Sequence, residues 1–109
     1  MPKVPEVTDP QAATFEVKVS FLGDMRSIVG RRDVHLVLSK GAILADLLTS
    51  LVKEYGEALR NRIFNAQGEL LRHTIVFING RDARERGGLQ VVLDGEDIDI
   101  LILPIFEGG

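Results

Sequence analysis

Residues 93–109 have the sequence LDGEDIDILILPIFEGG, in which a turn, a strand and a glycine terminus follow one another. The segment Asp94-Gly95-Glu96-Asp97 is typical of a turn, because glycine tolerates positive φ and aspartate side chains bond to nearby backbone. Residues 98–103 predict a strand with isoleucines on one face and mainly leucines on the other. Such a strand is typical of a sheet centre covered on both sides. Pro104 is expected to stop it, because proline cannot donate to a neighbouring strand.

The terminal pair Gly108-Gly109 has two interpretations. One interpretation is a frayed end in which the two glycines occur by chance, an event that average composition gives in about 0.5% of chains. The other is that the Gly109 carboxylate is a reactant, because two residues without Cβ form a thin thread that can enter a narrow cleft. Pro104 would hold the base of this thread off the sheet. The pair alone does not choose between them.

Length and composition restrict the classes of protein to which the chain can belong. The chain has 109 residues, enough for one domain with a core, and its hydrophobic share of 45% is ordinary for a globular protein. The net charge of -3 leaves no basic footprint for nucleic acid. The absence of cysteine excludes disulfides, a thiol nucleophile and a thiolate metal site, and we expect no bound metal. No apolar run is long enough for a membrane span and no signal pattern is present, so we expect a cytoplasmic protein.

The first third of the chain predicts two strands. Residues 1–13 contain three of the four prolines and predict a flexible arm. Apolar and polar residues then alternate over 15–21, which predicts a half-buried strand. Residues 22–32 predict a connection with one helical turn around Met25, in which Arg26 is interpreted as solvated. A second strand is expected over residues 34–38, and His35, on its polar face, is interpreted as a surface residue rather than a ligand.

One segment has the pattern of a long amphipathic helix. Its apolar residues recur at the spacing of a single stripe: Ile43, Leu44, Leu47, Leu48, Leu51, Val52 and Tyr55. Gly56 suits the position after the helix C-cap. Tyr55 could be a site residue, but its spacing favours a core position.

The second half of the chain alternates between short elements and turns. A connection with a short helical segment, 57–64, leads to a strand over 74–78 and a tight turn at Asn79-Gly80. The charged segment Arg81–Gly88 is interpreted as solvated, or as a contact for an acidic partner or a phosphate. A short strand is expected over 89–92. If the first and last strands are parallel neighbours, the fold is an α+β roll in which a mixed four- or five-stranded sheet packs on one helix.

Several motifs carry a resemblance to a known family. They are FLGDMRSIVG at 21–30, DLL at 46–48, INGRD at 78–82, GGL at 87–89 and the closing LDGED with Pro104 and the terminal glycines. In this order the chain resembles the MoaD/ThiS-like superfamily of β-grasp sulfur carriers and ubiquitin-like proteins. The resemblance covers about residues 15–109 and implies a β-grasp (ubiquitin-like) domain over 14–104, with a flexible Gly-Gly tail over 105–109.

Two positions depart from the family pattern. Members often begin the helix with threonine, and here the position is Ile43, which loses a side-chain cap of about 1 kcal/mol. The tail, Pro104-Ile105-Phe106-Glu107, is bulkier and more acidic than is usual. This departure bears on which partner accepts the tail and not on whether the tail is used.

The resemblance implies a carrier rather than an enzyme. An adenylyltransferase similar to ubiquitin-activating enzymes would use ATP to convert the Gly109 carboxylate to an acyl adenylate, and a persulfide donor would then leave a thiocarboxylate for sulfur transfer. The likeness is greatest to the small subunit of molybdopterin synthase, which implies the large subunit of that synthase, or another sulfur acceptor, as a partner. The alternatives are a thiamine-type carrier, a ubiquitin-like modifier joined to lysines through Gly109, and a plain interaction domain.

The tail also supplies the candidate contact residues. Phe106 and Ile105 are expected to be buried by the partner, because aromatic anchors dominate many interfaces. Glu107 and Gly108 complete the tail, and the Arg81 loop is the alternative docking site. The protein itself binds no cofactor in this scheme.

Overall fold

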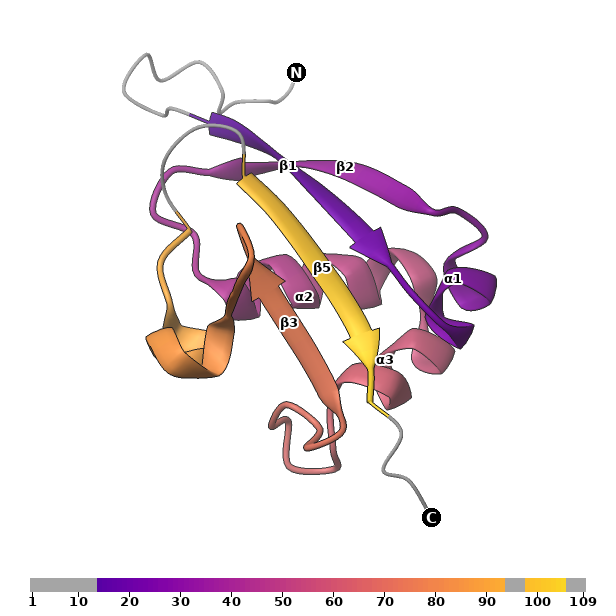
Figure 1. The fold of residues 1–109 in the computed structure, drawn as a ribbon. Coiled ribbons are helices and arrows are strands. Elements are labelled where there is room, and N and C mark those ends of the chain that lie inside the picture. Colours follow the sequence, from indigo (N-terminus) through magenta and orange to yellow (C-terminus); the bar gives the residue numbers. More distant parts are fainter. Residues whose placement is uncertain (1–13, 94–97, 106–109) are drawn as a thin grey trace.

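The computed structural model describes residues 14–93 and 98–105 (Figure 1). The predicted N-terminal arm at 1–13, the turn at 94–97 and the tail residues 106–109 lie outside the described residues.

A five-stranded mixed sheet forms one layer of the molecule, with the strand order β2-β1-β5-β3-β4. The central strand β5 (Ile98–Pro104) lies between β1 (Thr14–Phe21), to which it is parallel, and β3 (Thr74–Ile78), to which it is antiparallel (Figure 1). Strands β2 (Asp33–Ser39) and β4 (Arg81–Asp82) form the antiparallel edges. The predicted mixed sheet and the parallel pairing of its first and last strands are confirmed.

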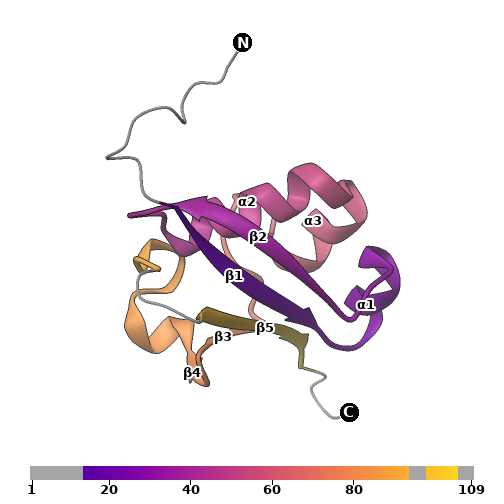
Figure 2. The ribbon, with the colours of Figure 1, turned by 90° about the horizontal axis from the view of Figure 1, so that it is seen from above.

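Helices cover one face of this sheet (Figure 2). The crossover helix α2 (Leu44–Tyr55) is the predicted amphipathic helix, and α1 (Asp24–Val29) and α3 (Glu57–Ile63) are short helices where helical turns were expected. The prediction of one helix therefore undercounts, because Leu59 and Ile63 of α3 are fully buried and fix that segment on the core. No helix among the described residues is long and apolar enough to cross a membrane.

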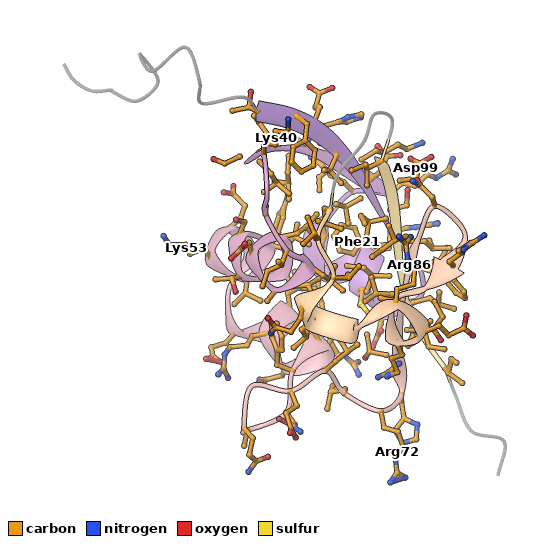
Figure 3. The ribbon with its side chains drawn as sticks, turned by 90° about the vertical axis from the view of Figure 1, so that its left-hand side faces the viewer. Phe21, Lys40, Lys53, Arg72, Arg86 and Asp99 are labelled. Atoms are coloured by element: carbon orange, nitrogen blue, oxygen red, sulfur yellow. The ribbon has the colours of Figure 1, made fainter. Side chains whose placement is uncertain are left out.

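The core lies between the sheet and the helices. All nine residues expected to form it are buried: Val17, Val19, Leu44, Leu47, Leu48, Leu51, Ile98, Ile100 and Ile102. Phe21 joins them in the interior, whereas Lys53 and Arg72 point outward (Figure 3). Tyr55 is half-buried against the core and His35 is exposed, as predicted.

The helix α2 begins without a side-chain cap, as expected for Ile43. The loss is partly offset, because the backbone N–H of Ile43 donates to Oδ2 of Asp46 at 2.9 Å. This bond is the reciprocal half of a capping box and needs no oxygen on the first residue.

The prediction that both faces of β5 are covered by other parts of the protein is wrong. Leu101 and Leu103 are only half-buried and Asp99 is exposed, and no helix of the described residues lies over this side (Figure 2). The neighbouring strand β1 presents Glu16 and Lys18 on the same outer face, and charged side chains do not accept an apolar covering layer.

Two further predictions need correction around the charged segment. Residues 81–82 form β4, because Asn79 and Gly80 adopt the positive φ values of 49° and 85° that turn the chain back onto β3. Residues 89–92 do not form a strand of the sheet, since Gly88–Gln90 is a 3-10 turn. Val92 makes only an isolated bridge to Ile43.

Candidate functional site

The root of the C-terminal tail, residues 104–105, is held against β3. Pro104 stays in register opposite Thr74, and the backbone N–H of Ile105 donates to the carbonyl of His73 at 2.7 Å. The expectation that Pro104 holds the tail off the sheet is therefore wrong.

The register explains why proline is tolerated there. Antiparallel pairs alternate between hydrogen-bonded and non-hydrogen-bonded positions, and because Ile105 bonds to His73, the Pro104–Thr74 pair is non-bonded. The nitrogen of Pro104 faces the β1 side of the sheet, and the β1 pairing ends at Phe21, opposite Ile102. Pro104 therefore lies past the last residue that pairs with β1, at the end of the strand, where a missing donor is tolerated.

Gly23 bounds the tail root on the side away from β3. Its φ of 68° and ψ of -149° lie in a region that is essentially restricted to glycine. A Cβ at this position would come within 2.8 Å of Cγ of Pro104. Glycine at position 23 therefore leaves the space that the Pro104 ring fills.

Arg84 connects the charged segment to the tail root. Its Nη1 donates to the carbonyl of Thr74 at 3.0 Å, and its Nη2 donates to the carbonyl of Leu71 at 2.5 Å. Arg84 is exposed, as the interpretation of the Arg81–Gly88 segment as solvated predicts, but its guanidinium also bonds to two backbone carbonyls of the same chain.

A groove of about 430 Å³ lies beside the tail root. An ion pair between Arg62 and Asp24 joins α3 to α1, and Arg62 is also one wall of the groove. The full lining is Met25, Arg62, Leu71, His73, Thr74, Pro104 and Ile105. The groove thus offers apolar walls and one guanidinium where the tail leaves the domain.

The structure separates two of the predicted contact residues. Ile105 is 40% exposed at the tail root, as expected for a partner contact. Arg81 is exposed but pairs with Ile78, at the opposite end of β3 from Thr74 and therefore about 13 Å away. Phe106, Glu107 and both terminal glycines lie outside the described residues.

Arg26 is exposed, as expected, and its Nε donates to the carbonyl of Phe21 at 3.3 Å.

An apolar patch on the open face of the sheet was missed at the sequence level. We call it the outer-face patch, and it consists of Ile75, Phe77, Leu101 and Leu103, all half-buried. A second groove, of about 320 Å³, lies at its edge and includes Lys18, Phe77 and Leu101. The signal that could have found it is the polar alternation of the neighbouring strand over residues 16–20, which is incompatible with a covering layer.

The described residues contain no cluster of three or more histidine or carboxylate side chains that could hold a metal ion.

Comparison with known proteins supports the fold and the family resemblance. The ThiS family model matches residues 19–109. Small archaeal modifier protein 3 of Haloferax volcanii is 30% identical over 94 residues, which cover 86% of this chain and 99% of that protein. The solution structure of small archaeal modifier protein 1 from Methanosarcina acetivorans has a TM-score of 0.74 and 30% identity, and the match covers 89% of this chain and 99% of that one.

A chain in the crystal structure of the BexX/CysO complex from Amycolatopsis orientalis is also similar, with a TM-score of 0.69 and 26% identity. The match covers 85% of this chain and 99% of that one. These relatives confirm the β-grasp fold and the resemblance on which the expected function depends.

Proposed function

We propose, because the chain belongs to the ThiS family, that it is a carrier protein whose Gly109 carboxylate is activated by adenylylation and converted to a thiocarboxylate. The observation that carries the proposal is the anchored tail root. The central strand of the sheet ends at Pro104, the next residue, Ile105, is bonded to His73, and four residues follow Ile105 in the sequence. These four residues span at most about 13 Å, so the activating enzyme has to approach within that distance of Ile105.

The chemistry requires activation because a free carboxylate is a poor electrophile. A carboxylate oxygen of Gly109 attacks the α-phosphorus of ATP, pyrophosphate leaves, and an acyl adenylate forms. The terminal sulfur of a persulfide donor then attacks the acyl carbon and displaces AMP. A thiol cleaves the resulting acyl disulfide, which leaves the thiocarboxylate and a disulfide on the donor side. The carrier supplies the carboxylate, and the partner supplies ATP and the catalytic groups.

We propose that the activating enzyme, an adenylyltransferase similar to ubiquitin-activating enzymes, docks on the outer-face patch and the groove at the tail root. Both surfaces are continuous with β5, the strand that leads into the tail, so one partner can bind them and still reach the terminus. Half-buried apolar side chains such as Phe77 and Leu101 suit the centre of such an interface. Their packing on the partner would remove them from water without changing the core.

For the acceptor, we propose a molybdopterin synthase large subunit or another sulfur acceptor. This assignment rests on the likeness of the motifs to the small subunit of that synthase. ATP consumption by the activating partner favours the cytoplasm as the location.

A second candidate function is that of a ubiquitin-like modifier, in which activated Gly109 forms an isopeptide bond with a lysine of a target protein. The observation that favours it is the 30% identity to a protein named as an archaeal modifier. The two functions share adenylylation and differ only in the nucleophile that attacks the adenylate.

Intact mass spectrometry of the chain purified from cells separates these functions. Replacement of one oxygen by sulfur at the terminus adds about 16 Da and marks the sulfur carrier. Lysine conjugates that disappear when Gly109 is deleted mark the modifier. Incubation of the purified chain with ATP and the adenylyltransferase tests the shared step. If no adenylate forms on the wild-type chain, both functions are refuted and a plain interaction domain remains.

A further inference from the structure

We propose that Arg84 is a positioning residue for the C-terminal carboxylate, because its guanidinium fixes the segment of backbone that anchors the tail root. The inference deepens the proposed function and rests on it, since it concerns how the Gly109 carboxylate is presented to the activating enzyme. Arg84 touches no reacting atom and acts only through the 71–74 segment.

The guanidinium clamps both ends of that segment. It donates to the carbonyls of Leu71 and Thr74 at 2.5 and 3.0 Å, and the N–H of Thr74 also donates to the carbonyl of Leu71 at 3.1 Å. A planar fork with several fixed donors can hold two carbonyls at once, which an ammonium group does less well. Arg84 therefore closes the turn between Leu71 and Thr74 from outside.

The same segment is fastened to α3 on its inner side. Thr74 is 3% exposed, and its Oγ1 donates to the carbonyl of Arg62 at 2.6 Å. His73 lies between the two clamped residues, and its carbonyl accepts the N–H of Ile105 at 2.7 Å. The direction of this carbonyl is thus set by bonds on either side of it.

The anchor determines how much of the tail is free. With Ile105 bonded to His73, four residues follow the last anchored one, a reach of about 13 Å. If the root opens back to Leu103, six residues are free and the reach grows to about 20 Å. The carboxylate then samples a larger volume, and the partner must order two more residues on binding. Ordering even one backbone residue lowers affinity about tenfold.

The chain offers a matched control for Arg84. Arg86 belongs to the same 3-10 turn, Ala83–Arg86, and is exposed (Figure 3). Its side chain makes no hydrogen bond or ion pair with the described residues. Arg84→Gln and Arg86→Gln remove the same charge from the same turn, and only the first removes the clamp. Arg84→Lys keeps the charge and loses the fork.

The first readout is amide hydrogen exchange by NMR, which needs no partner. We expect the Ile105 amide to exchange about tenfold faster in Arg84→Gln than in the wild type, with Arg84→Lys in between and Arg86→Gln unchanged. The amide of Ile100, in the middle of β5, serves as the internal reference. A general loss of stability would accelerate both amides, whereas loss of the anchor accelerates only that of Ile105.

The second readout is the kinetics of adenylylation with ATP and the adenylyltransferase. We expect Arg84→Gln to raise the KM for the carrier by up to about tenfold at nearly constant kcat, in proportion to the fraction of chains whose root is open, because the partner reorders the root once it is bound. Deletion of Gly109 should be less harmful in Arg84→Gln than in the wild type, since the opened root supplies the missing length. A double-mutant cycle measures this coupling.

The proposal is overturned if Ile105 exchanges equally in Arg84→Gln and Arg86→Gln, or if the two variants have the same KM. A failure of the proposed function is distinguishable, because it appears as a wild-type chain that is not adenylylated at all. In that case the exchange of the Ile105 amide alone decides whether Arg84 anchors the tail root.

Discussion

Replacement of Gly23 by alanine should move the tail root without touching the core. An added Cβ would lie 2.8 Å from Cγ of Pro104 and 3.2 Å from its Cδ. Ordinary contacts begin at 3.4 Å, so the proline ring has to retreat by about 0.6 Å. The backbone strain of a non-glycine residue at this φ and ψ adds about 1–3 kcal/mol.

Gly56 provides the control for this substitution. Its φ of 86° and ψ of -167° resemble those of Gly23, but a Cβ there would meet nothing within 4 Å. Both alanine variants should lose about 1–3 kcal/mol from backbone strain. Gly23→Ala should lose about 1–3 kcal/mol more from the crowded proline, or about 4–8 °C of Tm for each kcal/mol.

Thermal unfolding and NMR amide shifts measure the two effects separately. The shifts of Thr74 and Ile105 should change in Gly23→Ala and stay constant in Gly56→Ala. Adenylylation should also weaken selectively in Gly23→Ala, as a raised KM for the chain, because a displaced Pro104 alters the root from which the tail is presented. Equal Tm losses together with unchanged Ile105 shifts would refute the assignment of Gly23 as the residue that makes room for Pro104.

Three other predictions concern the core, the interface and the terminus. Leu48→Ala should cost about 2–5 kcal/mol in urea unfolding, because Leu48 is fully buried, and a smaller loss would contradict the packing described. Phe106→Ala and Phe77→Ser should each weaken binding of the adenylyltransferase in calorimetry at an unchanged fold, and if neither does, the partner docks elsewhere. Deleting Gly109, or adding one alanine after it, should abolish adenylylation read by intact mass while Tm hardly moves, because one residue shifts the carboxylate by up to about 3.5 Å. Adenylylation of both at the wild-type rate would mean that the terminus is not the reactant.

Strands β1, β2, β3 and β5 and the helix α2 were predictable because their signals are local. The alternation over 15–21 and the stripe of α2 each place apolar side chains on one face, and the fold buries those faces. The central position of β5 also followed from its apolar composition. Its cover did not, because whether Leu101 is buried depends on what the adjacent strand presents on the same face. That is a property of strand order rather than of one segment.

The tail root was predicted poorly for the same reason. Proline is a general strand breaker, but at position 104 its missing donor faces a place where the β1 pairing has already ended. The Arg84 clamp joins residues 10 and 13 positions apart, so nothing in the charged segment itself distinguishes Arg84 from Arg86. The first feature depends on the pairing of β5 with its neighbours and the second on how the 83–86 turn packs against residues 71–74, and a single sequence specifies neither.

Substitutions in three regions of the protein, which β5 connects, are expected to change different measured quantities. Changes in the core, such as at Leu48, alter the free energy of unfolding and leave the terminus where it was. Changes at the tail root, at Gly23 or Arg84, leave most of the core intact and alter how often the tail is presented correctly, which is expressed in KM. If the proposed function holds, changes at Gly109 alter the reacting group itself and are expected to affect the chemical step. In the proposed function the chain contributes no catalytic group, so substitutions at the tail root are expected to alter the reaction through the presentation of the tail alone.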